Sequence, residues 1–169
     1  MINQLLLLGI LMEGKMHGYQ LNDYVKHAMS LYTDLKKSTT YFVLDQLEKE
    51  GCVSYEVERE GKRPERRVYE TKKKGKIHFH KLLRECISSY TPKNLTEDIG
   101  IAFMDKLEPS EIEKLLENKQ QRIKDELKKS DDIKDHGGSL KYVIDHNIAY
   151  LNADLKWVNS ILKDIRREC

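Results

Sequence analysis

The sequence has little cysteine, proline, glycine and tryptophan, with 3, 3, 9 and 1 residues of these types among 169. The cysteines, Cys52, Cys86 and Cys169, have no paired spacing, and together with the six histidines they complete no zinc pattern. An odd number of cysteines leaves at least one thiol unpaired, so free thiols in a reducing compartment are expected. We therefore predict neither a bound metal nor a cofactor.

Catalytic motifs are lacking as well. The sequence shows no nucleophile–base pair, and its few glycines are scattered at turns rather than gathered in a phosphate-binding loop. We predict that the protein is not an enzyme.

Long apolar runs are also missing, so no segment is long enough to cross a bilayer. The run Leu5–Leu8 lacks a preceding basic region and a small-residue cleavage site, and the charged stretch 13–15 soon interrupts the apolar pattern. We expect a cytoplasmic protein with no membrane partner. The predicted helix 2–12 is apolar nearly all round, which favours burial on most of its faces, between domains or subunits.

Charged residues, in contrast, are abundant, at 34% of the chain with a formal net charge of +2. They are unevenly distributed: between Arg59 and Arg84 there are 11 Lys and Arg but only 3 Asp and Glu. A local positive excess in a nearly neutral chain indicates a site for a polyanion. A solvated basic face is the alternative.

The most informative segment is 38–75, which predicts a short helix, a β-hairpin and a new helix. Ser38 is suited to cap the first helix and Gly51 to end it. Along that helix we expect Tyr41, Leu44 and Leu47 to form the stripe that anchors the core, with Thr39, Thr40, Val43 and Gln46 off the stripe.

The hairpin is predicted from two runs rich in valine and tyrosine, 52–59 and 66–71. The loop between them contains glycine and proline beside Lys62 and Arg63, a composition that suits contact with phosphate better than packing. The order helix, hairpin, helix is typical of a winged helix-turn-helix, a DNA-binding module.

The second half of the chain predicts helices alone, with one from about Pro109 to Lys129 and a last one from Ser139 to about Arg167. Apolar residues of the last helix recur at spacings of four and three, the pattern of a coiled-coil seam. Its members are Ile144, Ile148, Leu151, Leu155, Val158, Leu162 and Ile165. We predict that the first six form a dimer interface; the alternative is packing within the chain, against residues 112–127.

The predicted fold is therefore mainly α with a small β-hairpin wing. Residues 1–90 are expected to form a winged helix-turn-helix DNA-binding domain, and residues 91–169 a helical dimerisation domain.

Several short motifs, in order, together carry a resemblance to a known family. They are Leu6 to Met12, Met16-His-Gly-Tyr19, Ser38-Thr-Thr-Tyr41, Glu50-Gly51, Gly61-Lys-Arg-Pro64, Val68-Tyr69 and Thr71-Lys-Lys-Lys-Gly75. With these motifs nearly the whole chain resembles the PadR family of bacterial and archaeal transcriptional regulators. The resemblance implies a homodimeric repressor with an N-terminal winged helix. It also implies a candidate effector site near the dimer interface, since some relatives bind phenolic acids or cationic drugs there.

The chain departs from the family pattern in its central helix. Family members often have Leu-Tyr-Pro where this chain has Thr40-Tyr41-Phe42, and they commonly carry basic residues where it has Asp45 and Gln46. An acidic residue in the middle of the helix shifts the expected phosphate contacts toward the wing.

The predicted DNA-binding residues come from the central helix, the wing and the turn before the second helix. They are Ser38, Thr39, Thr40, Tyr41, Lys62, Arg63, Arg66, Arg67 and Tyr19. Tyr41 is assigned to the core, to DNA contact or to both. For Lys72–Lys74, phosphate contact and simple solvation of a helix end are both open.

A second predicted site flanks the seam of the last helix. Tyr150, Asp154 and Trp157 share a face there and are candidate ligands of a flat or cationic molecule. The alternative is that Trp157 packs against the first helix of a partner subunit.

Taken together, the sequence predicts a sequence-specific DNA-binding transcriptional regulator, a repressor acting as a homodimer on an operator in double-stranded DNA. A small aromatic ligand is a candidate effector that would release it. The competing interpretation is a winged-helix adaptor that binds other proteins and not DNA, and DNA binding with a steep salt dependence would exclude it.

Overall fold

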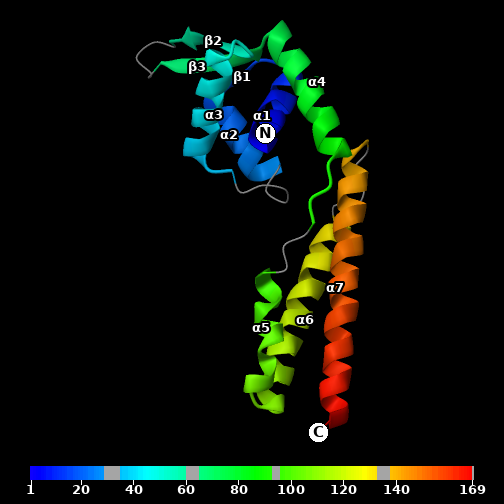
Figure 1. Cartoon of the computed structure of the whole chain (residues 1–169). Helices are drawn as coiled ribbons and strands as arrows, with labels where there is room; N and C mark the ends of the chain where they lie inside the picture. Colours follow the sequence, from blue (N-terminus) through cyan, green and yellow to red (C-terminus); the bar gives the residue numbers. More distant parts are fainter. Residues whose placement is uncertain (29–34, 60–64, 93–95, 133–137, 169) are drawn as a thin grey trace. The chain divides into compact units, whose positions relative to one another are not determined.

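The structure is a computed structural model that describes residues 1–28, 35–59, 65–92, 96–132 and 138–168. It divides into two compact units, Met1–Pro92 and Lys93–Cys169. Each unit is described by itself (Figure 1).

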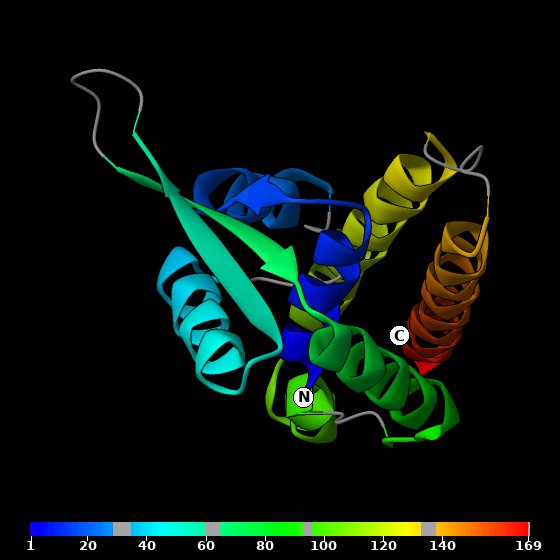
Figure 2. The same ribbon diagram turned by 90° about the horizontal axis from the view of Figure 1, so that it is seen from above.

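The first unit combines helices with a small antiparallel sheet whose strand order is β1-β3-β2. Its elements are α1 (Ile2–Met12), β1 (Met16–His17), α2 (Gly18–Ala28), α3 (Lys37–Lys49), β2 (Val53–Glu58), β3 (Arg66–Thr71) and α4 (Lys73–Ser88). Strands β2 and β3 pair from Val53 opposite Thr71 to Glu58 opposite Arg66, and Figure 2 shows them extending together beyond the helices. The predicted fold class, mainly α with a hairpin wing, is confirmed.

Strand β1 was not expected, because residues 14–18 read as a turn. Met16 and His17 instead pair with Tyr69 and Val68 of β3. Two residues are too few to show the alternation that marks a strand in a sequence. The pairing ties the start of α2 to the wing.

Helix α1 lies in the core of the first unit, where it packs against α3, α4 and β3. Leu7 and Leu8 are fully buried, and Ile10 and Leu11 nearly so. Full burial of such a side chain contributes roughly 1.5–3 kcal/mol, so α1 is a main source of this unit's stability. The expectation that α1 lies between domains or subunits is wrong for these four residues, since elements of the same unit cover them.

The core face of α3 consists of Thr40, Val43, Leu44 and Leu47. This is the i, i+3, i+4, i+7 spacing of an amphipathic helix. The predicted stripe included Tyr41 and left out Thr40 and Val43, so its centre was rotated by roughly 50°, about half the angle between successive residues. Tyr41 lies at the edge of the core face, half-buried.

The second unit is helical throughout its described residues. It contains the short turns η1 (Thr96–Asp98), α5 (Ile99–Ala102) and η2 (Met104–Lys106), followed by α6 (Pro109–Asp132) and α7 (Leu140–Glu168). Helices α6 and α7 lie side by side (Figure 1) and make the main contact of this unit. No helix in the described ranges is long and apolar enough to span a membrane.

The seam of α7 packs within the chain. Val158, Leu162 and Ile165 are buried in one cluster with three residues of α6, Ile112, Leu116 and Ile123. Ile144 is also buried. Leu151 and Leu155 are partly buried and pack against the same cluster. The predicted dimer seam is therefore corrected for its buried members Ile144, Val158 and Leu162: all three are buried within the chain, and α6 packs against the last two.

Candidate nucleic-acid interface

The solvent-facing side of α3 carries Ser38, Phe42, Asp45 and Lys49, all exposed and spaced i, i+4, i+7, i+11. Gln46, exposed, and Thr39, half-buried, flank this row on one side. Helix α3 begins at Lys37 after Lys36, so Ser38 lies inside the first turn and is not the predicted cap. It is nevertheless available on the exposed face.

Thr40 is not available to DNA. Its side chain is 0% exposed, and its hydroxyl donates a hydrogen bond to the Lys36 backbone oxygen at 3.4 Å. The predicted DNA contact of Thr40 is therefore wrong, because the residue belongs to the core face of α3, where a buried hydroxyl needs an acceptor of its own chain.

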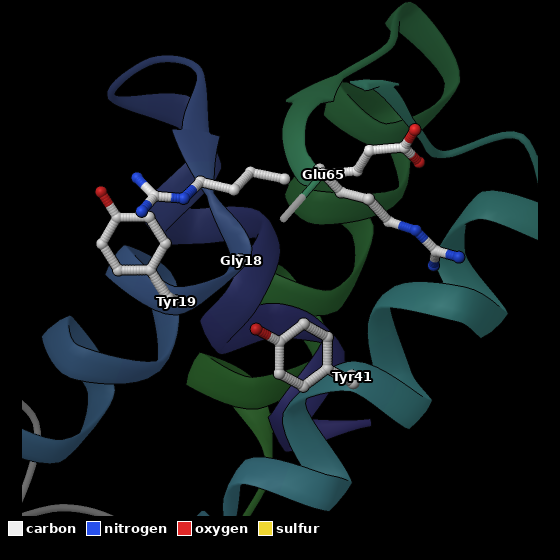
Figure 3. Close-up of a pocket in the computed structure, with 6 residues that line it drawn as sticks. Gly18, Tyr19, Tyr41 and Glu65 are labelled. Atoms are coloured by element: carbon white, nitrogen blue, oxygen red, sulfur yellow. The ribbon is translucent and has the colours of Figure 1, made fainter. Parts of the chain in front are cut away.

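An open pocket of about 560 Å³ lies between α2, α3 and the start of β3. Its lining residues are Gly18, Tyr19, Tyr41, Glu65, Arg66 and Arg67 (Figure 3). A Cβ on Gly18 would lie 2.9 Å from the Tyr41 ring, so glycine permits this ring to approach the turn. The Tyr41 ring packs against the core and also lines the open pocket, and its contact with DNA stays a prediction.

Tyr19 stands at the rim of this pocket between two neighbours. Its ring stacks on His17 at a centroid distance of 5.3 Å, and the Arg66 guanidinium lies 5.2 Å from the ring centroid. The backbone nitrogen of His17 donates to Gln20 Oε1 at 3.0 Å, which fixes the turn into α2. The predicted residues Tyr19 and Arg66 are therefore brought together, with the guanidinium held over an aromatic face.

Arg67 makes a different contact, toward α3. Its guanidinium lies 4.5 Å from the Tyr55 ring centroid and donates to Asp45 Oδ1 at 3.2 Å. Both members of this ion pair are about half exposed, at 48% and 52%. Asp45, which the sequence marked as unfavourable for phosphate contact, is thus paired with a cation of the wing.

We expect Asp45→Asn to tighten binding to any DNA several-fold, because it removes a negative charge from α3 and releases Arg67 for a phosphate. The salt slope of log Kd should steepen by about one unit, the contribution of one added phosphate contact. The measurement is fluorescence anisotropy with labelled DNA over a range of KCl concentrations.

Glu85→Gln is the matched control, since Glu85 forms an exposed ion pair of α4 with Lys81 at 3.9 Å. It should leave both affinity and slope unchanged. A slope unaltered by Asp45→Asn would show that Arg67 does not reach phosphate.

The remaining lysines and arginines that the sequence suggested for phosphate contact differ in their surroundings. Lys62 and Arg63 lie outside the described residues. Lys72 and Lys73 are exposed where α4 begins, whereas the Lys74 ammonium donates to the Glu50 backbone oxygen at 2.7 Å. Lys74 therefore stabilises the C-terminal end of α3, which favours a structural role for this one lysine.

Lys15 forms ion pairs with acidic residues of the sheet. It lies 2.8 Å from Glu70 and 3.8 Å from Glu56, and its hydrogen bond to Glu70 lowers the pKa of that carboxyl. Arg67 is likewise paired with Asp45, whereas Arg66 lies over the Tyr19 ring.

In the predicted ligand site of the second unit, a lysine of the same chain lies over the ring of Trp157. The Lys119 ammonium lies 4.9 Å from the Trp157 ring centroid, and the indole packs against the α6–α7 cluster. Asp154 is partly buried and Tyr150 is 38% exposed. Lys119 also approaches Asp98 at 3.9 Å. A cation of the same chain thus takes the place that the prediction reserved for a cationic ligand, and a ligand at Tyr150, Asp154 and Trp157 stays a prediction.

Within the described ranges, no three histidine, cysteine or acidic side chains gather as a metal site would require. Cys52 is buried, and burial raises the pKa of its thiol, which keeps it protonated as a core residue.

Comparison with known proteins identifies the first unit. Residues 7–81 match the family described as the transcriptional regulator PadR-like family. The winged helix is a PadR-like domain. This match runs from the middle of α1 to the middle of α4 and includes every described element of the candidate interface.

Solved structures resemble the chain over nearly its full length. Bacillus subtilis PadR in complex with operator DNA has 21% identity and a TM-score of 0.81, with coverage of 98% of this chain and 99% of that chain. The PadR-like transcriptional regulator BC1756 from Bacillus cereus has 16% identity and a TM-score of 0.71, covering 99% of both chains. The Vibrio cholerae virulence activator AphA has 11% identity and a TM-score of 0.71, again covering 99% of both. At these identities the likeness shows a shared fold. No curated protein matches the sequence.

Proposed function

We propose that this PadR-like protein is a transcriptional repressor that binds operator DNA as a homodimer through α3 and the wing. The observation that carries the proposal is the juxtaposition of the exposed face of α3 with Tyr19, Arg66 and Arg67. A helix with an uncovered polar face can enter a major groove, and the flanking cations and hydroxyls can hold the phosphates on either side. The solved complex of B. subtilis PadR with operator DNA supports this proposal by analogy of fold.

Pairing of two copies follows from the geometry of DNA, since two half-sites require two reading helices. In the second unit, the surface that we assign to the second copy is a row of exposed apolar residues at four-residue spacing, Ile99, Phe103 and Leu107, with Leu115 of α6. The buried members of the α7 seam, Ile144, Val158 and Leu162, do not take this role, because they are covered within the chain. Self-association through α5, η2 and α6 is therefore the interface that we propose.

A small aromatic effector remains part of the proposal. B. subtilis PadR has been solved in complex with p-coumaric acid, which supports a ligand of this class for the present chain. The candidate reporter is Trp157, the only tryptophan, whose fluorescence should be quenched saturably by such a ligand as operator affinity falls.

The test of the proposed function is salt-dependent binding to the DNA upstream of the protein's own gene. We expect specific binding to this fragment. Arg66→Ala, alone or with Lys62→Ala and Arg63→Ala, should weaken binding to every DNA by a similar factor and flatten the salt slope by about one unit per lost phosphate contact. The measurement is a mobility shift or anisotropy titration at several salt concentrations.

Lys81→Ala on α4 is the control, because it removes one exposed cation away from α3 and the wing. Absence of any salt-dependent DNA binding by the unaltered protein would favour the adaptor interpretation. In a reporter assay, deletion of the gene should raise expression from the bound promoter; a fall in expression would identify an activator instead.

A further inference from the structure

Phe42 is the one feature of the α3 face that charge and hydrogen bonding do not explain. Its side chain is 61% exposed, although phenylalanine gains roughly 1.5–3 kcal/mol from burial. It lies in the middle of a row whose other members, Ser38, Asp45 and Lys49, are polar. A large apolar side chain at the centre of a polar row is suited to an apolar group on the surface that this row meets.

The position of Phe42 on the helix restricts what it can touch. At about 100° per residue, Ser38 and Phe42 point nearly the same way, directly opposite the core residues Thr40 and Leu47. Arg67 pairs with Asp45 on the side of the row next to β3. Gln46 lies on the other side, one turn from Phe42, and is exposed.

We propose that Phe42 determines operator specificity by packing on the 5-methyl group of thymine in the major groove. This inference rests on the proposed function, because it requires α3 to enter that groove. The thymine methyl is the only apolar group that base edges present there, and phenylalanine is one of the side chains that contact it. Lys37 and Lys49 of the same helix, and Lys36 directly before it, are exposed and supply charge for the phosphates that flank the base.

Gln46 is placed to contact the base pair next to the one that Phe42 contacts. One helical turn separates Phe42 from Gln46, a rise of about 6 Å, which spans between one and two base-pair steps of DNA. Glutamine binds adenine in a bidentate manner through N6 and N7. The pair therefore fits an A·T-rich half-site in which a thymine read by Phe42 lies next to an adenine read by Gln46.

The test replaces single thymines of the operator with deoxyuridine, which lacks only the methyl group. For the unaltered protein, the substitution should weaken binding about fourfold at one thymine of each half-site, the loss that corresponds to burial of one methyl group. Phe42→Ala should bind the thymine and uracil operators with equal affinity. Its fold should be intact by circular dichroism, since Phe42 is not part of the core.

Gln46→Ala provides the matched control on the same helix face. It should keep the uracil sensitivity at the Phe42 position and lose sensitivity to 7-deazaadenine at the neighbouring adenine. Operator binding that ignores every thymine methyl, or an undiminished uracil effect in Phe42→Ala, would overturn this inference alone. Complete absence of specific DNA binding would overturn the proposed function with it.

Discussion

Gly75→Ala is expected to destabilise the first unit by about 3 kcal/mol, near the upper end of the usual cost of overpacking a core. A Cβ on Gly75 would lie 2.1 Å from the backbone oxygen of Cys52 and 2.9 Å from Thr71 Cγ2. The Cys52 oxygen is fixed, because it accepts a hydrogen bond from the Lys72 amide at 2.9 Å. Relief therefore requires α4 to move away from the start of β2 and to give up contacts with α1. Urea denaturation followed by circular dichroism measures the loss.

Gly100→Ala is the control, because it makes the same glycine-to-alanine change without a steric clash. Gly100 lies in α5, and a Cβ there would meet no heavy atom within 4 Å. Alanine should be neutral at this position or stabilise it by up to about 1 kcal/mol. Trp157 fluorescence reports the second unit separately, so Gly75→Ala should leave that transition in place. A Gly75→Ala protein as stable as the unaltered one would show that the junction of β2 and α4 is not closely packed in solution.

Val158→Asp is expected to unfold the second unit. Val158 is 0% exposed between α6 and α7, so the variant would place a carboxylate in an apolar contact with no described partner for it. The cost of such an unpaired charge is several kcal/mol, comparable to the whole stability of a small domain. Circular dichroism should show a large loss of helix signal, because α6 and α7 contribute 24 and 29 residues of helix. The proposed self-association should be lost with the fold.

Phe103→Asp separates folding from self-association. Phe103 is 63% exposed, so a carboxylate there stays hydrated and the helix signal should be retained. If the second copy covers this surface, sedimentation should show a shift to monomer, and operator affinity should fall with it. A folded Phe103→Asp protein that remains dimeric would place the interface elsewhere. A folded and dimeric Val158→Asp protein would contradict the intrachain packing of α7.

The order of helices and the wing could be predicted because their signals are local. Alternating β-formers on either side of a turn-rich loop marked β2 and β3, and apolar spacing marked α6 and α7. Element ends shifted by a few residues, as the start of α3 at Lys37 shows. Tyr19, Arg66 and Arg67 could also be predicted as candidates for the site. A tyrosine hydroxyl and arginine guanidinium groups are the chemistry that phosphate contact requires.

Other parts of the site were missed because the residue type does not reveal the direction of a side chain. Thr40 looked like a groove-facing hydroxyl and Phe42 like a family deviation without a role. A rotation of the inward face by roughly 50° is enough to exchange residues at its edges between core and solvent. The clue was the pair Val43 and Leu44, which together with Leu47 define the inward face more firmly than any stripe through Tyr41.

The sequence by itself determined the order of the long helices and the hairpin and where the positive charge gathers, because these depend on neighbours along the chain. Tertiary structure alone decided what covers each apolar face and which charges are already paired. The seam of α7 shows the reason: its heptad spacing specifies an apolar stripe, but α6 and a second subunit satisfy that stripe equally well. The Asp45–Arg67 pair joins residues 22 positions apart across α3 and β3, and only the folded first unit brings their charges within 3.2 Å.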